Sequence, residues 1–304
     1  MRKITIDGNF AASNIAYMFN DVAVIYPITP SSPMAENCDV FACENKQNIF
    51  GNKVVVTQMQ SEAGVAGAVH GSLIAGAKTT TFTSSQGLLL MIPNMYKIAG
   101  EGLPTVFYVA ARSLATHALN IFCDYSDVYA CLKTGFNIVN CSSVQEVNDI
   151  AIACELASVK SQIPYICFFD GFRTSHELNT IYQTELNDLN KIVDTKMFSD
   201  FRSRAMRVDN PYCAGTNQNP DVFMQNRVLA LNKYKTAIDD FKWALNKQKE
   251  ITGRDYDTVE YFGDANAKNV VVTMGSSADV LKLAQEQEKI KVGIIKIRML
   301  KPFD

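Results

Sequence analysis

A strand–helix–strand pattern in the N-terminal half decides the fold. Residues 54–83 read VVVTQMQSEAGVAGAVHGSLIAGAKTTTFT. The β-branched runs at 54–56 and 79–83 are typical of strands, and the Ala- and Gly-rich segment 61–77 between them is predicted as a helix capped by Ser61. Strands that alternate with helices in this way predict a parallel sheet covered by helices.

The same alternation continues on both sides of this segment. Strands are predicted at 22–26, 53–57, 79–83, 105–110, 136–139 and 164–169, and helix starts at Ser32, Ser61, Ser85 and Ser143. The apolar character of most of these strands predicts burial on both faces of the sheet. We therefore expect an α/β fold.

The region after residue 180 follows a different pattern. A polar stretch leads into one long amphipathic helix, which we expect to pack on the first domain. Its apolar stripe consists of Leu231, Tyr234, Ile238, Phe241 and Leu245. Alternation resumes with strands at 270–274 and 292–300 around a helix at 277–286. Because a single βαβ unit buries too little surface to fold alone, this second unit is expected to be incomplete at residue 304.

Composition excludes several classes of protein. With 304 residues and 47% hydrophobic content, the chain can build a large core. A formal charge of -2, from 29 basic and 31 acidic residues, gives no basic surface for nucleic acid or an anionic membrane, and no apolar run is long enough to cross a bilayer. The eight cysteines lack zinc-type or cluster-type spacing. We expect reduced thiols, mostly in the core, and no metal centre in this chain.

Three side chains are candidates for a functional site. Glu62 is a lone acid among Ala and Gly at a helix start, where it is better placed to meet a buried polar ligand than to face solvent. Thr29 and Arg112 also follow strands, and the carboxyl ends of parallel strands meet at one edge. A guanidinium and a hydroxyl can hold a small carboxylate, with Glu62 as a separate acid beside a cofactor. An ordinary salt bridge of Arg112 is the alternative.

Two polar segments keep two interpretations each. The segment Asp170–Glu177 follows a buried strand, so it could line a site or pack as a charged loop against the long helix. The segment Gly275–Ser277 lies between a strand and a helix, where its amides could bind an anion, although a simple tight turn is favoured.

Four strings resemble one enzyme family. They are YPITPSS at 26–32, QSEAG at 60–64, TFTSSQGLLLMIPNMYK at 81–97 and FFDGFRTSHE at 168–177. Together they closely resemble the pyruvate:ferredoxin (flavodoxin) oxidoreductase family, and the resemblance covers essentially the whole chain. The string GTNQNPD at 215–221 is similar to the large single-chain form of these enzymes.

The resemblance implies a domain division and roles for particular residues. Residues 1–258 would form the pyrimidine-binding domain of a thiamine diphosphate enzyme, and residues 259–304 would begin a domain similar to the transketolase C-terminal domain. Glu62 matches the glutamate that activates the cofactor, Pro27 belongs to the string expected to contact the cofactor, and Thr29 and Arg112 match the positions that hold the substrate carboxylate.

The resemblance also implies the reaction and its partners. The family oxidises pyruvate to acetyl-CoA and carbon dioxide, with coenzyme A as acceptor of the acetyl group, and passes electrons through iron–sulfur clusters to ferredoxin or flavodoxin. Magnesium and the [4Fe–4S] clusters belong to parts absent from this sequence, so the isolated chain is expected to be inactive. The full-length form is expected to be a homodimer in the cytoplasm, or in a hydrogenosome-like organelle if the source is eukaryotic. The alternative is a non-catalytic binding or dimerisation module.

Overall fold

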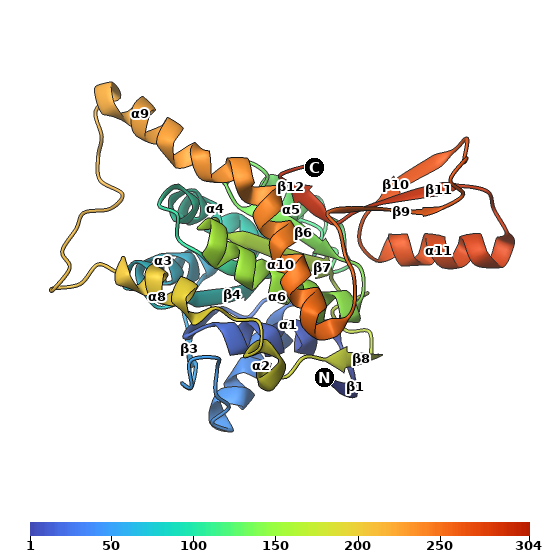
Figure 1. Ribbon diagram of the computed structural model, residues 1–304, viewed down its shortest axis with the longest axis horizontal. Coiled ribbons are helices and arrows are strands. Elements are labelled where there is room, and N and C mark those ends of the chain that lie inside the picture. Colours follow the sequence, from blue (N-terminus) through green and yellow to red (C-terminus); the bar gives the residue numbers. More distant parts are fainter.

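A seven-stranded sheet lies at the centre of the computed structural model, which describes residues 1–304 (Figure 1). Its order is β12-β6-β7-β5-β4-β2-β3, in which only β12 runs antiparallel to its neighbour. The strands are β2 (Val22–Ile25), β3 (Val55–Gln58), β4 (Thr79–Thr83), β5 (Val106–Ala111), β6 (Asn137–Cys141), β7 (Tyr165–Asp170) and β12 (Met299–Lys301). The predicted parallel sheet and its six predicted strands are confirmed.

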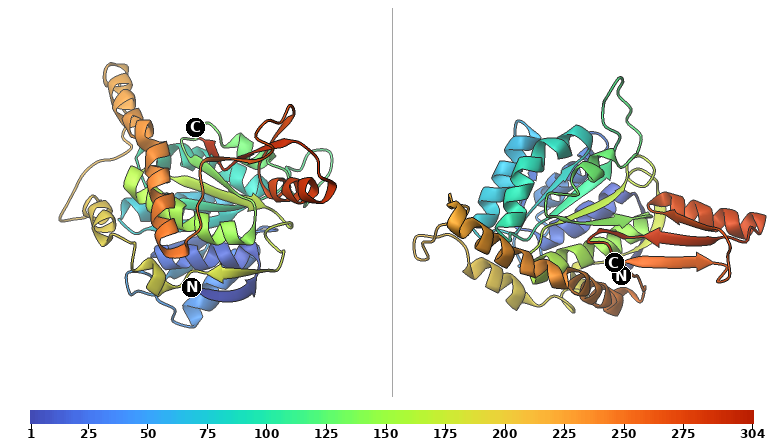
Figure 2. Two further views of the ribbon diagram at one scale, coloured as in Figure 1. Left: turned by 45° about the vertical axis from the view of Figure 1, so that its right-hand side comes forward. Right: turned by 90° about the horizontal axis from the view of Figure 1, so that it is seen from above.

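Helices cover both faces of this sheet (Figure 2). The first face carries α1 (Gly8–Phe19), α2 (Ser32–Cys43) and α6 (Val144–Ser161), and the second carries α3 (Glu62–Ile74), α4 (Ser85–Gly100) and α5 (Ser126–Ala130). Successive side chains of β5 alternate between the two cores, because neighbouring residues of a strand point to opposite faces. No helix combines the length and the apolar composition that crossing a bilayer requires.

A buried ion pair lies at the edge of the sheet where the parallel strands begin. Lys78 precedes β4 and donates to Glu155 of α6 at 2.6 Å, with both side chains fully buried. Asn20 and Tyr108 donate to the other oxygen of Glu155 at 2.9 and 3.0 Å. A buried charge pair is tolerated when further hydrogen bonds satisfy it, as they do here.

The predicted long amphipathic helix with its stripe from Leu231 to Leu245 is only partly packed. It is made of α9 (Pro220–Leu231), a 3₁₀ turn at Asn232–Thr236 and α10 (Ala237–Thr252). In α10 the stripe residues Phe241 and Leu245 are buried against α6, as predicted. The prediction is wrong for Leu231, which is exposed, because α9 projects beyond the sheet and has no buried residue (Figure 1).

The chain also forms elements that the local pattern did not indicate. At the N-terminus, β1 (Arg2–Ile6) pairs antiparallel with β8 (Asn179–Gln183). Two short helices, α7 (Leu186–Leu189) and α8 (Thr195–Ser203), follow β8.

The C-terminal segment forms a small sheet of its own. Parallel β10 (Val270–Thr273) and β11 (Gly293–Ile297) flank α11 (Ser276–Glu288), which confirms the βαβ prediction. The sheet has a third strand that was not predicted, β9 (Val259–Gly263), which pairs antiparallel with β11. The predicted strand at 292–300 is in fact two strands, because the chain leaves β11 and continues as β12 in the main sheet. The division between residues 258 and 259 stays a prediction.

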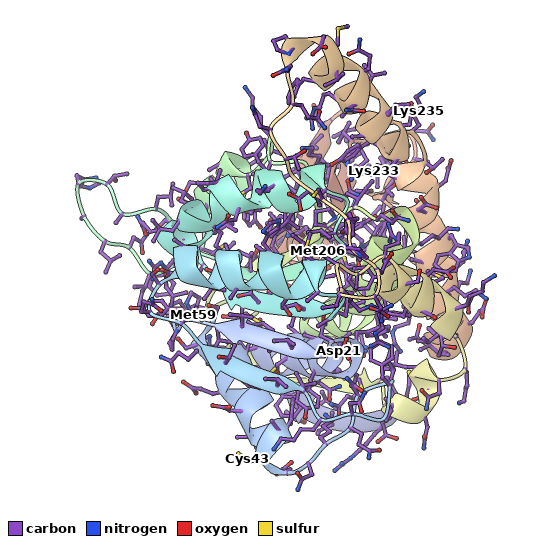
Figure 3. All side chains as sticks on the ribbon, turned by 90° about the vertical axis from the view of Figure 1, so that its left-hand side faces the viewer. Asp21, Cys43, Met59, Met206, Lys233 and Lys235 are labelled. Atoms are coloured by element: carbon purple, nitrogen blue, oxygen red, sulfur yellow. The ribbon has the colours of Figure 1, made fainter.

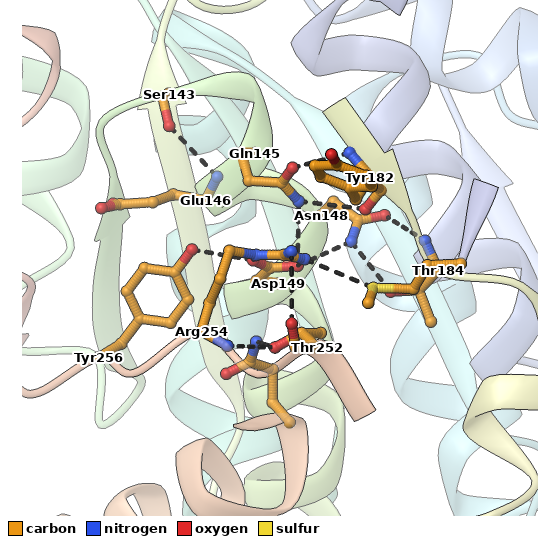
Figure 4. A network of polar contacts seen from close by, with 12 residues as sticks. Ser143, Gln145, Glu146, Asn148, Asp149, Tyr182, Thr184, Thr252, Arg254 and Tyr256 are labelled. Atoms are coloured by element: carbon orange, nitrogen blue, oxygen red, sulfur yellow. Dashed lines mark hydrogen bonds and ion pairs between the residues drawn. The ribbon is translucent and has the colours of Figure 1, made fainter. Parts of the chain in front are cut away.

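Polar contacts from α6 hold the chain that leads into this sheet (Figure 4). Asp149 is fully buried and accepts hydrogen bonds from Arg254 and Tyr256, which follow α10. One turn earlier, Glu146 accepts hydrogen bonds from Lys296 and from Arg298, the latter at 3.0 Å. Two carboxylates of one helix therefore fix both the entry to the small sheet and the exit from it.

Acid is expected to weaken the Glu146 contact. Burial alone would raise the pKa of Glu146, but the cations of Arg298 and Lys296 lower it to about 2. Because the folded-state pKa lies below the unfolded value, the contribution to stability is complete above about pH 4.5 and is lost progressively as the pH falls toward 2.

Chemical denaturation of the 304-residue chain at pH 7 and pH 3 checks this expectation. Glu146→Gln should lower the free energy of unfolding by about 3 kcal/mol at pH 7, and clearly less at pH 3. Glu286→Gln, at an exposed position of α11, should change the stability little at either pH. A Glu146→Gln effect of equal size at both pH values would contradict the assignment.

Candidate active site

Four neighbouring strands deliver the candidate residues to one edge of the sheet. Thr29 follows β2, Glu62 follows β3, Ser84 and Ser85 follow β4, and Arg112 follows β5. These strands are adjacent in the order β5-β4-β2-β3, and all are parallel. The predicted convergence of these positions is confirmed.

Glu62 is buried at the start of a helix that is rich in Ala and Gly. It is the first residue of α3, behind the N-cap Ser61, whose hydroxyl accepts the Gly64 N–H at 3.2 Å. Figure 3 shows α3 beside α4 on the outside of the molecule, with Met59 near the start of α3. Only 7% of Glu62 is exposed, and its carboxylate has no hydrogen-bond partner in the chain. The oxygens themselves are not completely buried, so the carboxylate can accept a hydrogen bond from a ligand.

A glycine makes room for this carboxylate. A Cβ atom at Gly87, in the first turn of α4, would lie 2.6 Å from Glu62 Oε1 and 2.7 Å from Thr83 Oγ1. The Thr83 hydroxyl is itself buried without a hydrogen-bond partner. The missing side chain at Gly87 therefore lets the Glu62 carboxylate lie against the start of α4, close to the Thr83 hydroxyl.

Arg112 is oriented by neutral oxygens. Its Nη1 donates to the main-chain oxygen of Thr29 at 2.7 Å and its Nη2 to Gln86 Oε1 at 3.3 Å. Its Nε is buried and has no partner, and no carboxylate lies within ion-pair distance of the guanidinium. The salt-bridge alternative for Arg112 is therefore wrong. Burial lowers the pKa of Arg112, while the carboxylates of Asp127 and Glu62 raise it, so Glu62 lies close enough to interact with this charge.

Asp127 is a site residue that the sequence did not indicate. Its carboxylate accepts the backbone N–H groups of Ser85 at 2.8 Å, Arg112 at 3.1 Å and Val128 at 2.8 Å. Burial raises the pKa of Asp127 to about 6, against the effect of these donors. The start of α4 is therefore held by Asp127. The helices start at Ser32 and Ser85 as predicted, but neither residue is the cap, because Ser31 and Ser84 occupy the N-cap positions and Ser85 has a φ of +50°.

The turn after β2 brings Thr29 to Arg112. Asn9 of α1 donates to the Pro30 carbonyl at 3.0 Å, and Ser31 and Ser32 donate backbone N–H groups to the Ile28 carbonyl. The side chain of Thr29 is exposed, as is Pro27 in the same turn. The contact of Pro27 with a cofactor stays a prediction.

The three side chains fit the aminopyrimidine half of a thiamine diphosphate site together with a carboxylate substrate. The Glu62 carboxylate, next to Gly87, offers a hydrogen-bond acceptor that no donor of the chain uses, and a ring nitrogen of the cofactor needs such an acceptor. Arg112 offers the N–H groups of Nη1 and Nη2 that its own hydrogen bonds do not use, and Thr29 is exposed in the turn that Arg112 contacts.

Known proteins resemble this chain over nearly its whole length. It is 51% identical to the pyruvate:ferredoxin oxidoreductase of Moorella thermoacetica and 49% identical to the pyruvate-flavodoxin oxidoreductase of Trichormus variabilis, which match 100% and 99% of this chain. The chain spans 26% of the length of each of these two relatives.

A solved structure and a family model match as well. The 2-oxoglutarate:ferredoxin oxidoreductase of Magnetococcus marinus has the same fold, with a TM-score of 0.74 and 19% identity over 99% of this chain and 54% of that one. The family described as pyruvate flavodoxin/ferredoxin oxidoreductase, thiamine diphosphate-binding, matches residues 14–241. The chain therefore belongs to the thiamine diphosphate-binding family of pyruvate flavodoxin/ferredoxin oxidoreductases.

Proposed function

We propose that this chain is the cofactor-activating and substrate-holding part of an enzyme that oxidatively decarboxylates pyruvate to acetyl-CoA and carbon dioxide. The observation that carries the proposal concerns the side chain of Glu62. It is largely buried, its carboxylate receives no hydrogen bond from the chain, and it lies against Gly87. The names of the relatives, which are pyruvate oxidoreductases, support pyruvate as the substrate.

Each residue has a separate task in this proposal. Thiamine diphosphate, when bound, supplies the carbon nucleophile and electron sink that decarboxylation of a 2-oxoacid needs. Glu62 accepts a hydrogen bond from the ring and holds a proton at its carboxylate oxygen. Arg112 and the Thr29 hydroxyl hold the substrate carboxylate, and Gln86 and the Thr29 carbonyl fix the direction of the guanidinium.

The rest of the enzyme would supply the remaining chemistry. We propose that residues 1–258 are the pyrimidine-binding domain and that residues 259–304 begin a transketolase C-terminal-like domain. The diphosphate site with its magnesium, the [4Fe–4S] clusters and the contacts with coenzyme A would lie outside residues 1–304. The full-length protein would act as a cytoplasmic homodimer that reduces ferredoxin or flavodoxin.

Replacement of the acid tests the proposal directly. In the full-length enzyme, Glu62→Gln should lower pyruvate-dependent reduction of a low-potential dye about 100-fold or more, because an amide cannot take up the proton. Binding of thiamine diphosphate, measured by calorimetry, should persist. Glu36→Gln, at an exposed position of α2, serves as the control. Full activity of Glu62→Gln would refute the assignment of Glu62.

The close approach of Glu62 to Gly87 gives a second test. Gly87→Ala would place a methyl group against Glu62 Oε1, so we expect kcat to fall about 10-fold or more while the enzyme stays folded. Gly100→Ala, on the same helix, has no atom within 4 Å of the added carbon and should leave dye reduction and thermal stability nearly unchanged. Equal activity of the two variants would show that activity does not depend on the space that Gly87 leaves for Glu62.

The isolated 304-residue chain is expected to show no pyruvate oxidation above background, even with thiamine diphosphate, magnesium and coenzyme A present. Its helical circular dichroism and a cooperative melt should establish that it is folded. Robust pyruvate-dependent dye reduction by this chain would mean that the whole cofactor site lies within it.

A further inference from the structure

The loop Asp170–His176 is held in a strained shape at the same edge of the sheet. The main-chain oxygen of Asp170 accepts the N–H groups of Thr174 and Ser175 at 2.9 and 3.1 Å. The N–H of Phe172 donates to Ser175 Oγ at 2.7 Å, and Phe172 has a φ of +61°, in the left-handed region that bulky residues avoid. Such strain persists where surrounding contacts over-determine the backbone, and it is concentrated at functional sites.

The loop packs directly on the residues next to Thr29 and Arg112. The N–H of Gly171 donates to the carbonyl of Ala111 at 3.0 Å, and Ala111 precedes Arg112. A Cβ atom at Gly171 would collide with this carbonyl and would lie 2.9 Å from Cγ of Pro30, which follows Thr29. A shift of this loop would therefore move both sides of the substrate-carboxylate site.

A second set of contacts connects the loop to the same turn through α1. The carbonyls of Thr174 and Ser175 accept the N–H groups of Gly8 and Asn9 at 3.1 and 3.2 Å. The side chain of Asn9 then donates to the carbonyl of Pro30 at 3.0 Å. The loop, the start of α1 and the turn at Pro30 thus form a closed ring of hydrogen bonds and contacts.

The Asp170 carboxylate points away from this ring, toward the small C-terminal sheet. It is 6% exposed, and it accepts the Tyr125 hydroxyl at 2.7 Å and the N–H of Ser276, the first residue of α11, at 2.9 Å. Gly275 has a φ of +71°, and a side chain there would collide with the Tyr125 hydroxyl. The segment Gly275–Ser277 is therefore a tight turn whose helix start faces an internal carboxylate.

We propose that Asp170 is a positioning residue, which couples the docking of α11 to the geometry of the site formed by Thr29 and Arg112. Its side chain bonds to Ser276 and Tyr125, while its main chain and Gly171 fix Ala111 and Pro30. Because a misplacement of about 1 Å is enough to weaken a site 100-fold, small changes in docking would alter substrate binding. This inference rests on the proposed function.

The test compares variants of the full-length enzyme. Asp170→Asn leaves one acceptor oxygen for two donors, the Ser276 N–H and the Tyr125 hydroxyl, so we expect the KM for pyruvate to rise about 10-fold while kcat changes less than about 3-fold. Glu286→Gln, at an exposed position of α11 away from the loop, is the control and should change neither constant by more than about 2-fold. Tyr125→Phe, which removes one hydrogen bond to Asp170, should act as Asp170→Asn does but more weakly, and it keeps the test usable if Asp170→Asn does not fold.

Hydrogen exchange separates this inference from the proposed function. Without substrate, Asp170→Asn should speed amide exchange at Gly171, Thr174, Ser175, Gly8 and Asn9, whereas the control Glu286→Gln should not. Faster exchange with an unchanged KM would overturn the coupling and leave Asp170 a packing residue. Unchanged exchange would overturn it as well. If the unaltered enzyme fails to oxidise pyruvate, the proposed function fails, and the exchange rates alone decide whether α11 and the loop are coupled.

Discussion

The parallel arrangement of the strands β2, β3, β4, β5, β6 and β7 in the main sheet is the constraint on which the other features depend. Parallel strands need crossover connections, and those connections are the helices that bury both faces of the sheet. Parallel strands also end at a common edge, so Glu62, Arg112 and Asp170 lie along one edge although they are far apart in sequence. The opposite edge carries Lys78 and Glu155, whose charges are fully paired.

The difference between satisfied and unsatisfied polar groups marks the functional edge. Glu155 and Glu146 are buried with two or more donors each, which is how structural charges are normally accommodated. Glu62 is 7% exposed and receives no hydrogen bond from the chain, and at the same edge Thr83 Oγ1 and Arg112 Nε are buried without a partner. An unsatisfied buried polar group destabilises the fold by about 1–3 kcal/mol, so two such atoms together with a carboxylate that lacks a donor are explained best by a bound ligand.

Local sequence predicted much of the fold because helices and strands depend on nearby residues. The strands and the caps Ser61 and Ser143 follow from periodicity and capping chemistry. The pairing of β1 with β8 could not be predicted, because it depends on a tertiary contact between distant segments. The sequence likewise placed Thr29, Glu62 and Arg112 at one edge, but Asp127 carries no local signal, since its role depends on three backbone donors that only the folded chain assembles.

The projecting helix α9 has a consequence for how a cell would handle this chain alone. Its apolar residues, such as Phe223, Met224 and Leu229, are more than half exposed, and none of its side chains is buried. Chaperones and quality-control proteases recognise unfolded polypeptide by such exposed apolar segments. In a cell that made only these 304 residues, chaperones and proteases would therefore bind a natively folded helix as if it were unfolded. The lifetime of the chain would depend on whether another protein surface covers α9.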